Sequence, residues 1–326
     1  MPDPTSSRPA PTGAGRPRVL RRVLIATACT LLAVLLALVG SVTALEARAS
    51  RIEVTLHRSK NGEKTLLVVG IDDRSQAPEK STDFGEPGSD PGARADVILA
   101  IRTGPAGSRA VSITRDLLLE YEPQRYDRAA TTWLRGPQPF MDGICRTLGM
   151  PVDHVAVVNL RGFASLVDRI GGVEVELAEP LRDPWAHIDL PAGRQRLDGR
   201  EALGYVRSRQ GEVLSQGQWI PDPEGAAGRQ RRTGEVLRAL AAQVPRNPVA
   251  LYGLAWDVLP EISLDRETGL GDLAAFRKLT PNVTVLPVAG GTEPEDWVAW
   301  DIPETHQALG NLDMAPGCDP SFKAER

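Results

Sequence analysis

The sequence predicts one α/β or α+β domain, in which helices cover a central sheet, preceded by one transmembrane helix. Two patterns predict this architecture. An uncharged apolar run occupies residues 23–45, and beyond it short β-rich runs alternate with segments of helical periodicity. The 326 residues are 41% hydrophobic and 25% charged, which is typical of globular proteins and excludes a mainly disordered chain.

The N-terminal segment predicts a disordered tail followed by a membrane anchor. Residues 1–22 are rich in Pro and carry five Arg and one Asp. As a helix, residues 23–45 span about 35 Å, enough to cross a hydrocarbon core of about 30 Å. Arginines before this run and a mainly acidic chain after it favour a cytoplasmic N-terminus and an extracytoplasmic domain.

Two alternatives to a retained anchor are a cleaved signal peptide and a buried core helix. Ala47-Arg48-Ala49 resembles a small-residue cleavage site, but the apolar run is longer than a usual signal core. A core helix is disfavoured because an arginine cluster directly precedes the uncharged run. The retained anchor predicts a single-pass protein of the cell membrane.

The chain therefore divides into five parts. They are a disordered cytoplasmic tail (1–22), a transmembrane helix (23–45), a juxtamembrane linker (46–64), an extracytoplasmic domain (65–310) and a C-terminal tail (311–326). Everything after the anchor carries 33 basic and 41 acidic residues, a formal charge of −8. This charge disfavours a nucleic-acid partner.

Within the domain, periodicity places strands and helices in order. Strands are expected at 65–71, 96–102, 108–114, 154–158, 173–177 and 282–288. Helices are expected from Asn159, as N-cap, to Gly171-Gly172, and at 199–207, 228–244, 248–259 and 270–279. A Pro/Gly/Ser/Asp-rich stretch, 77–93, predicts a loop between the first two strands.

Several familiar chemistries are absent from the sequence. It has no GxSxG, no GxxxxGK[ST] and no GxGxxG motif, and its four His residues share no metal-ligand spacing. Cys29 lies within the membrane segment. Cys145 and Cys318 lie beyond it, where oxidation is permitted, and the sequence leaves open whether they pair.

Acidic and basic residues gather instead at the ends of the first three strands of the domain. They are Asp72, Asp73, Arg74, Arg94, Asp96, Arg115 and Asp116. Carboxylates at adjacent strand ends can share a hard cation such as Mg²⁺, and neighbouring arginines suit phosphate oxygens. The alternative is an ordinary surface salt-bridge network.

The predicted helix at 228–244 argues for a site. At 100° per residue, Arg229 and Arg232 fall on the apolar stripe of Val236 and Leu240. Other arginines of this helix fall on the opposite side. Arginines on an inward stripe need anions, so the helix predicts an anion-binding pocket next to apolar surface. The segment YVRSR adds Arg207 and Arg209. Such a pocket suits a pyrophosphate with a lipid tail.

These residues resemble the LytR-CpsA-Psr family of bacterial cell-wall enzymes. LLVVGIDDR resembles its Gly-x-Asp-x-Arg motif, RADVILAIR its Arg-Ser-Asp segment and SITRD its Ser-Ile-Pro-Arg-Asp. Residues 152–183 and 190–209 match nearly throughout. The likeness runs from about 65 to 244 and continues more weakly to about 310. Each motif is weak alone, but five in order behind a membrane anchor are specific.

The resemblance implies an α/β/α domain with a central mixed sheet and a lipid groove. It implies transfer of a glycopolymer from a polyprenyl-pyrophosphate carrier to peptidoglycan, with Mg²⁺ or Mn²⁺ held by Asp72 and Asp96. Arg94 and Arg115 would act with these carboxylates in catalysis. Pyrophosphate oxygens would be bound by Arg74, Arg94, Arg115, Arg207, Arg209, Arg229 and Arg232. The general base is not identified, with Asp73 and Asp116 as candidates.

The chain also departs from the family pattern. Ala226 stands where an Asp usually precedes Gly-Arg, Thr233 replaces the Gln of an Arg-Gln pair, and 208–227 is longer than expected. The alternatives are a non-catalytic protein that binds the lipid carrier or wall glycan, and a transcriptional regulator. Both aspartates of the expected metal site are present, which favours catalysis, and the membrane segment with an acidic ectodomain disfavours DNA contact.

Overall fold

The computed structural model describes residues 16–59, 62–72, 92–105, 107–208, 210–276, 283–290 and 298–318. The chain forms two compact units, residues 1–47 and 48–326. In the first unit, α1 (Arg16–Glu46) includes the whole predicted run 23–45. Its segment Cys29–Glu46 has a mean hydropathy of 2.1, and only 6% of this segment is buried. This helix is therefore apolar and long enough to cross a membrane.

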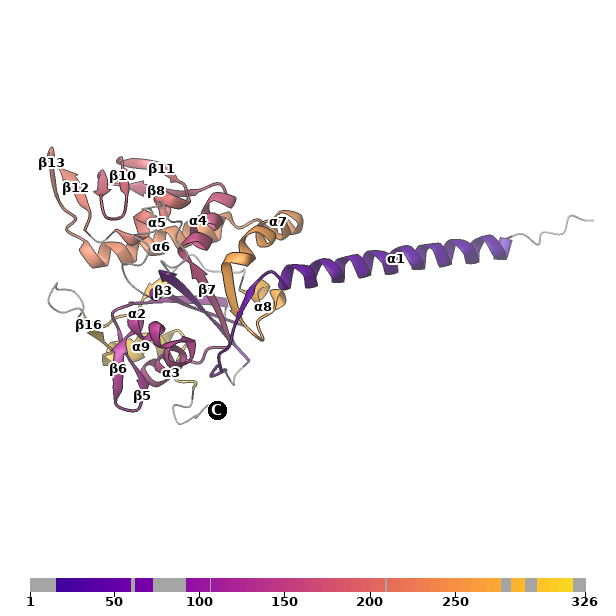
Figure 1. The fold of residues 1–326 in the computed structure, drawn as a ribbon, viewed down its shortest axis with the longest axis horizontal. Coiled ribbons are helices and arrows are strands. Elements are labelled where there is room, and N and C mark those ends of the chain that lie inside the picture. Colours follow the sequence, from indigo (N-terminus) through magenta and orange to yellow (C-terminus); the bar gives the residue numbers. More distant parts are fainter. Residues whose placement is uncertain are drawn as a thin grey trace, which may run out of the picture. The chain divides into compact units, whose positions relative to one another are not determined.

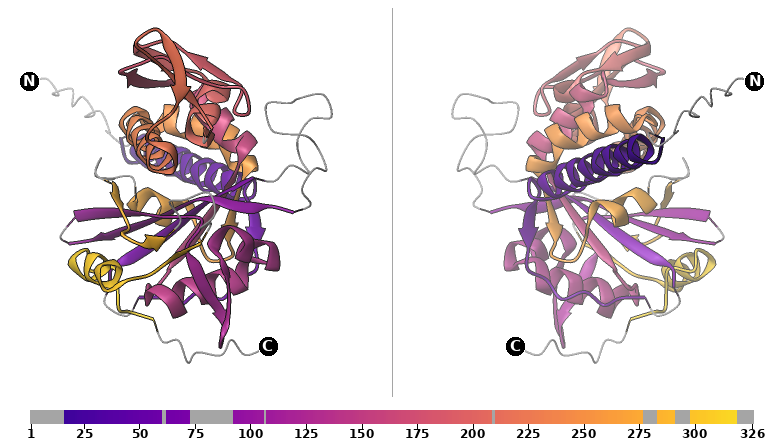
Figure 2. Two further views of the ribbon diagram at one scale, coloured as in Figure 1. Left: turned by 90° about the vertical axis from the view of Figure 1, so that its left-hand side faces the viewer. Right: turned by 90° about the vertical axis from the view of Figure 1, so that its right-hand side faces the viewer.

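Seven strands form the central sheet of the second unit, counted over the described residues (Figures 1 and 2). In spatial order they are β1 (Ser50–Ile52), β14 (Ile262–Asp265), β7 (His154–Asn159), β2 (Lys64–Asp72), β3 (Arg94–Gly104), β4 (Gly107–Ile113) and β15 (Val283–Val285). The pairs β1–β14, β2–β7 and β4–β15 are parallel, and β14–β7, β2–β3 and β3–β4 are antiparallel. The sheet is therefore mixed, as expected.

Helices cover both faces of this sheet, which gives the α/β/α layering (Figure 1). Below the sheet in Figure 1 lie α2 (Ala129–Thr132), a 3₁₀ turn (Trp133–Arg135), α3 (Pro137–Leu148), α9 (Pro303–Asn311) and the hairpin β5 (Leu118–Glu122)–β6 (Arg125–Arg128). Their core includes Phe140 and Ile144 of α3, both fully buried, which belong to one cluster with Leu67 and Val69 of β2.

Above the sheet lie α4 (Leu160–Arg169), α5 (Gly199–Arg207) and α6 (Gly225–Gln243). They carry a two-stranded sheet of β8 (Val173–Leu177) and β11 (Gly193–Leu197), and a four-stranded sheet of β9 (Leu181–Asp183), β10 (Ile188–Leu190), β12 (Glu212–Ser215) and β13 (Gln218–Pro221). The remaining elements are α7 (Pro248–Val258), a 3₁₀ turn (Leu259–Glu261), α8 (Leu270–Ala275), β16 (Ala289–Gly290) and β17 (Ala299–Trp300).

Local sequence signals match the structure closely in the upper layer. The Asn159 side chain accepts a hydrogen bond from the Gly162 amide at 2.7 Å and caps α4. Gly171 and Gly172, which follow α4, have φ of 85° and 88°, a conformation that favours Gly. Strand β8 alternates as predicted, with its hydrophobic residues buried and its two Glu residues exposed. Helix α6 begins three residues before the predicted start.

Two predicted boundary segments take part in the fold. The predicted linker 46–64 contains β1, an edge strand of the central sheet, which pairs with β14. Three residues are too few to show a period-2 pattern, and the partner strand lies more than 200 positions away. This strand therefore could not be predicted from the sequence. In the predicted C-terminal tail, Met314 is fully buried and Cys318 forms a disulfide with Cys145. Their Cα atoms are 5.9 Å apart, a separation suited to a disulfide.

Candidate functional site

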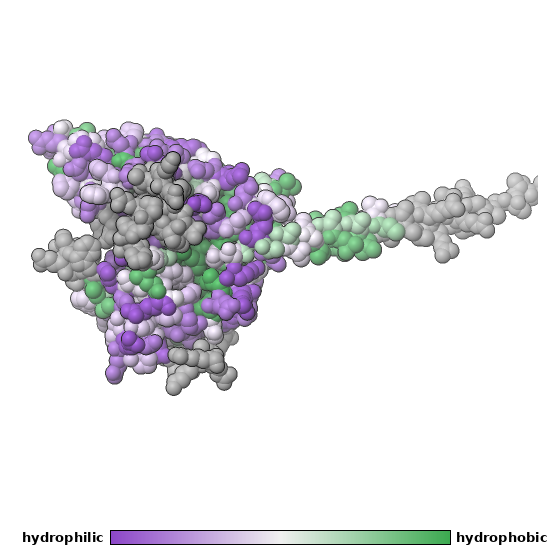
Figure 3. Space-filling view, in the orientation of Figure 1, coloured by the Kyte–Doolittle hydropathy of each residue, from purple (hydrophilic) through white to green (hydrophobic). Residues whose placement is uncertain are grey.

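A cavity of about 330 Å³ lies between the sheet and the helices α4, α5 and α6. One part of its wall is apolar and is formed by Val68, Ile71, Val97, Ile98, Ile113, Val158, Leu160, Phe163, Leu166, Leu203, Val206, Val236, Leu237 and Leu240. The other part carries charged and polar groups, namely Asp72, Arg94, Asp96, Ser112, Thr114, Arg115, Asn159, Arg207, Arg229 and Thr233. Figure 3 shows hydrophobic surface in the hollow between the upper and lower layers.

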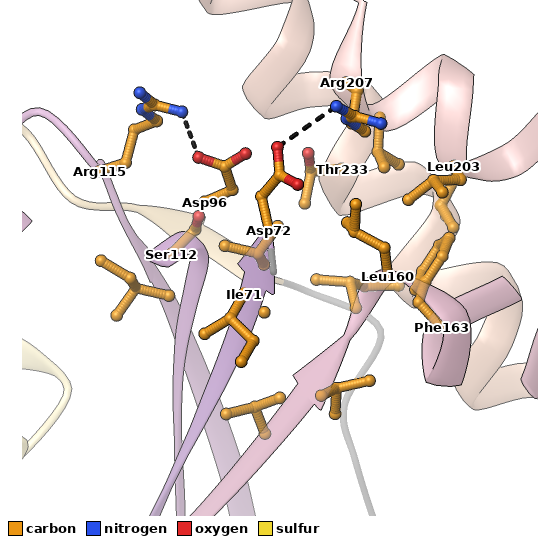
Figure 4. A pocket seen from close by; sticks show the side chains of 18 of the residues that line it. Ile71, Asp72, Asp96, Ser112, Arg115, Leu160, Phe163, Leu203, Arg207 and Thr233 are labelled. Carbon is orange, nitrogen blue, oxygen red and sulfur yellow. Dashed lines mark hydrogen bonds and ion pairs between the residues drawn. The ribbon is translucent and has the colours of Figure 1, made fainter. Parts of the chain in front are cut away.

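The two predicted metal-binding carboxylates lie side by side at the charged part of the cavity (Figure 4). Asp72 ends β2 and Asp96 lies near the start of β3. The β2–β3 ladder pairs Gly70 with Val97 and Ile71 with Ala95, so Asp96 is the extra residue of a β-bulge. A bulge redirects the side chain of the inserted residue, and here it accompanies the placement of Asp96 beside Asp72.

Each carboxylate is paired with an arginine from a different element. Arg115, after β4, bonds the Asp96 carboxylate, and Nη2 of Arg207, the last residue of α5, lies 3.3 Å from Oδ2 of Asp72 (Figure 4). The side chains of all four residues are at most 20% exposed. In such partly desolvated surroundings ion pairs are stronger than at the surface. The two pairs therefore place the carboxylates next to each other, with one arginine on the outer side of each (Figure 4).

The helical phase predicted for α6 is confirmed. Arg229 is 9% exposed and Arg232 is 3% exposed, whereas Arg231 and Arg238 are exposed. Val236, on the same stripe, is fully buried. The inward face of this helix therefore carries two guanidinium groups, as the period of 100° per residue predicts.

The two inward arginines of α6 differ in surroundings. Arg229 lines the cavity, but Arg232 is not among the cavity-lining residues. Nη1 of Arg232 lies 2.7 Å from a carboxylate oxygen of Asp222, and its Nη2 donates to the Ser208 carbonyl at 2.9 Å. Arg232 thus joins the end of the β12–β13 hairpin to the end of α5. The helical periodicity predicted that Arg232 points inward, but its bonding partners lie outside the helix.

Some of the remaining predicted site residues have a described position, and others lie outside the described residues. Arg94 lines the cavity, opposite Asp72 in the β2–β3 ladder. Arg74, Arg209 and the candidate base Asp73 lie outside the described residues. The other candidate base, Asp116, is 8% exposed and is not among the cavity-lining residues, and its carboxylate lies 3.6 Å from Nε of Arg115.

Sequence reasoning missed polar groups of the wall that carry no charge. Ser112, Thr114 and Asn159 line the cavity, although Asn159 had been identified only as a helix cap. The hydroxyl of Thr233 lies in the wall one turn from Arg229 and donates to the Arg229 carbonyl at 2.9 Å. The residue's place on the α6 stripe was the available signal, since it lies four positions after Arg229.

A phenol beneath α6 is held in its neutral form. Burial, together with the negative charge of Glu235, raises the pKa of Tyr205, whose hydroxyl donates to Glu235 at 2.9 Å. Glu235 also pairs with Arg231 on the outer face of the helix. This chain of contacts fixes α6 against α5, which together carry Arg207 and Arg229.

The donor set fits a hard cation that is shared with a substrate. Among the described residues, no group of three or more His, Cys, Asp or Glu side chains is arranged to hold a metal. Mg²⁺ commonly uses one or two carboxylates, several waters and the phosphates of a substrate. Asp72 and Asp96 supply two carboxylates in one wall, so they suit this kind of site better than a dedicated protein cage.

A comparison with protein families assigns the chain that forms this site: the model described as the LytR_cpsA_psr family matches residues 38–274. This chain belongs to the LytR-CpsA-Psr family. A solved LytR-CpsA-Psr fold is similar to it: the structure of the LytR-Csp2A-Psr enzyme from Actinomyces oris superposes with a TM-score of 0.70 at 31% identity, covering 84% of this chain and 97% of that chain.

Two curated LytR-CpsA-Psr relatives extend the comparison. The chain is 33% identical over 194 residues to the probable cell wall biosynthesis protein LcpB of Corynebacterium glutamicum, which covers 58% of this chain and 47% of LcpB. It is 26% identical over 243 residues to the polyisoprenyl-teichoic acid–peptidoglycan teichoic acid transferase TagU of Enterococcus faecalis, which covers 67% of this chain and 73% of TagU. The chain thus spans about half the length of LcpB.

Proposed function

We propose that this protein is a membrane-anchored phosphotransferase that moves a glycopolymer from a polyprenyl-pyrophosphate carrier to peptidoglycan. The observation that carries the proposal is the cavity with one apolar part and one part lined by carboxylates and arginines. A polyprenyl pyrophosphate has the same two-part character, a long apolar chain and a compact anion. The transferase name of the E. faecalis relative supports the same reaction class.

The apolar wall binds the lipid tail. Phe163 and Leu166 of α4 and Leu237 and Leu240 of α6 line the same cavity from two helices. Apolar surface buried by a chain in this groove contributes about 25 cal/mol per Å². Hydrophobic burial therefore holds the carrier, and it places the pyrophosphate at the charged end.

The arginines of the charged wall bind the pyrophosphate oxygens. Arg94, Arg115, Arg207 and Arg229 line the cavity, and a guanidinium can hold two phosphate oxygens at once. When the pyrophosphate binds, Arg115 and Arg207 give up part of their hydrogen bonding to Asp96 and Asp72 and bind phosphate oxygens instead. The resemblance adds Arg74 and Arg209 to this set and, more distantly, Arg232, which is tied to Asp222.

Asp72 and Asp96 would hold Mg²⁺ or Mn²⁺ against the pyrophosphate. A cation held there would neutralise charge that develops on the phosphate oxygens during transfer. The guanidinium groups of Arg94 and Arg115 stabilise the same charge from the protein side. The oxygen of a peptidoglycan hydroxyl attacks the phosphorus next to the sugar, the bond from that phosphorus to the lipid phosphate oxygen breaks, and the hydroxyl proton ends on the leaving polyprenyl monophosphate. A phosphodiester forms and polyprenyl monophosphate leaves, while water in place of the acceptor gives pyrophosphatase activity.

The proposed location follows from α1 and the reaction. The helix crosses the cell membrane once with the N-terminus in the cytoplasm, so residues 48–326 face the wall. A reporter fused after residue 326 should be active only outside the cytoplasm. Activity of the reporter inside the cytoplasm would contradict both the topology and the wall reaction.

A reconstituted reaction tests the chemistry. The full chain is incubated in vesicles with a polyprenyl-pyrophosphate glycan, Mg²⁺ and peptidoglycan oligomers, and the conjugate is sought by mass spectrometry. Asp96→Asn keeps the shape of the side chain but removes the charge, so it should abolish Mg²⁺-dependent conjugate formation, and a cooperative thermal melt confirms that the variant is folded. A variant that forms conjugate at the wild-type rate would refute the metal assignment. A stable binder of the lipid that never forms conjugate would identify a non-catalytic carrier protein.

A further inference from the structure

The exposed face of α7 (Pro248–Val258) is apolar. Val249 is 79% exposed and Trp256 is 38% exposed. Tyr252 lies one turn before Trp256, and the two rings stack with centroids 6.1 Å apart. At 100° per residue these three side chains fall within an arc of about 60°. Surface helices of water-soluble domains usually turn polar residues outward, so this helix has the opposite pattern.

The one charged residue of α7 does not join this face. Asp257 falls about 100° from Trp256 and lies 3.2 Å from the Arg169 guanidinium of α4. The outward arc of α7 therefore carries no charge. Hydrophobic residues come to the surface of the domain at the place of α7 in Figure 1, as the same view coloured by hydropathy shows (Figure 3).

A contact with Arg48 places α7 near the point where the chain leaves the membrane. The Arg48 guanidinium lies 4.3 Å from the centroid of the Trp256 ring, and its Nε donates to the Trp256 carbonyl at 2.9 Å. Arg48 follows Glu46, the last residue of α1, by two positions. Two residues span at most about 7 Å. If α1 crosses the bilayer, covalent connection alone keeps this part of α7 at the bilayer surface.

We propose that α7 lies in the outer interface of the bilayer and docks the domain onto the lipid. The proposal rests on the membrane anchoring of α1 given above. Trp and Tyr favour the interface because their rings are apolar and their N–H or O–H groups are polar. Arg48, Arg169 and the exposed Arg246, which precedes the cap of α7, lie around the helix and suit anionic lipid phosphates.

This docking gives the lipid carrier a short route into the cavity. Helix α4 bears Arg169 beside α7 and contributes Phe163 and Leu166 to the apolar wall. One helix, about 10 Å across, therefore separates the lipid-facing side of the domain from the lipid-binding part of the cavity. A polyprenyl chain then leaves the bilayer next to the groove, and little of it is exposed to water on the way.

Fluorescence quenching by brominated lipids tests the placement directly. The full chain is reconstituted in vesicles of phosphatidylcholine and phosphatidylglycerol with bromine on shallow acyl carbons. Wild-type tryptophan emission should be quenched, and Trp256→Phe should remove that quenching. Trp185 is 80% exposed in the turn between β9 and β10 and serves as a matched control. Trp185→Phe should leave the quenching unchanged. Equal losses in both variants, or no loss in Trp256→Phe, would overturn the proposal.

A turnover measurement separates docking from catalysis. Val249→Asp puts a charge on the exposed face at the start of α7, where an acidic residue favours the helix. It should lower turnover of a long-chain donor in vesicles about two- to fivefold, because a charge near the interface disfavours the docked state by up to about that factor. Turnover of a short-chain, water-soluble donor should be unchanged. Val249→Thr should behave as wild type with both. Equal loss with both donors, or loss with neither, refutes docking by α7. A wild type inactive with both donors refutes the proposed function, and the quenching experiment still decides α7.

Discussion

The two faces of α6 allow a test in which charge is held constant. Arg229 and Arg238 lie on the same helix and are nine residues apart. Arg229 is 9% exposed and lines the cavity, whereas Arg238 is exposed and its Nε donates to the Gly234 carbonyl at 3.2 Å within its own helix. A purely long-range electrostatic effect treats the two arginines alike. Direct binding of a phosphate treats them differently.

The expected size follows from the contact that is lost. A hydrogen bond to a charged group contributes about 1.5–3 kcal/mol, which is about tenfold to over a hundredfold in affinity. Arg229→Gln should therefore weaken binding of a polyprenyl phosphate by at least about tenfold. Arg238→Gln removes a solvent-side charge and should change the affinity by no more than about twofold.

The assay is titration of both purified variants and the wild type with one polyprenyl-phosphate ligand. Melting temperatures confirm that each variant is folded, and a repeat at higher salt checks for screening. Long-range effects weaken as salt rises, but a contact inside the cavity weakens less. If both variants lose affinity equally, or if Arg238→Gln loses more, the assignment of Arg229 to the phosphate site is refuted.

Three further predictions concern stability. Arg232→Gln should lower the free energy of unfolding by about 3–5 kcal/mol because it leaves a buried carboxylate partner unpaired, and thermal melts that match wild type would contradict this. Cys145→Ser with Cys318→Ser opens a link across 173 residues and should cost about 2–5 kcal/mol; thiol labelling of the denatured, unreduced wild type should label Cys29 alone, and labelling of all three cysteines would contradict the bridge. A hydrogen bond from Arg102 lowers the pKa of Glu63 below 4.5, so its stabilisation is present above about pH 4.5 and is lost as the pH falls through the folded pKa. Melting curves from pH 6 to 3 should therefore fall more steeply for wild type than for Glu63→Gln, and parallel curves would refute this coupling.

Much of the fold and part of the site were predictable because they depend on local patterns. An uncharged run longer than a signal core predicts α1, and alternation predicts β8. A stripe repeating at 100° per residue predicts which side of α6 faces inward, and the buried Arg229 and Arg232 confirm it. The face that a residue occupies is set within its own helix or strand, so the sequence encodes it directly.

Only the tertiary structure decided what those faces meet. The three-residue strand β1 pairs with β14, more than 200 positions later in the chain, and Cys145 forms a disulfide with Cys318 across 173 positions. Arg232 shares the inward face with Arg229, yet it binds Asp222 beyond the cavity, while a bulge in the β2–β3 ladder accompanies the placement of Asp96 beside Asp72. Period and composition fix direction along one element, but they carry no information on the register and packing between elements that are distant in sequence. Those depend on the packing of the whole core, which selects the partner for each inward-facing charge.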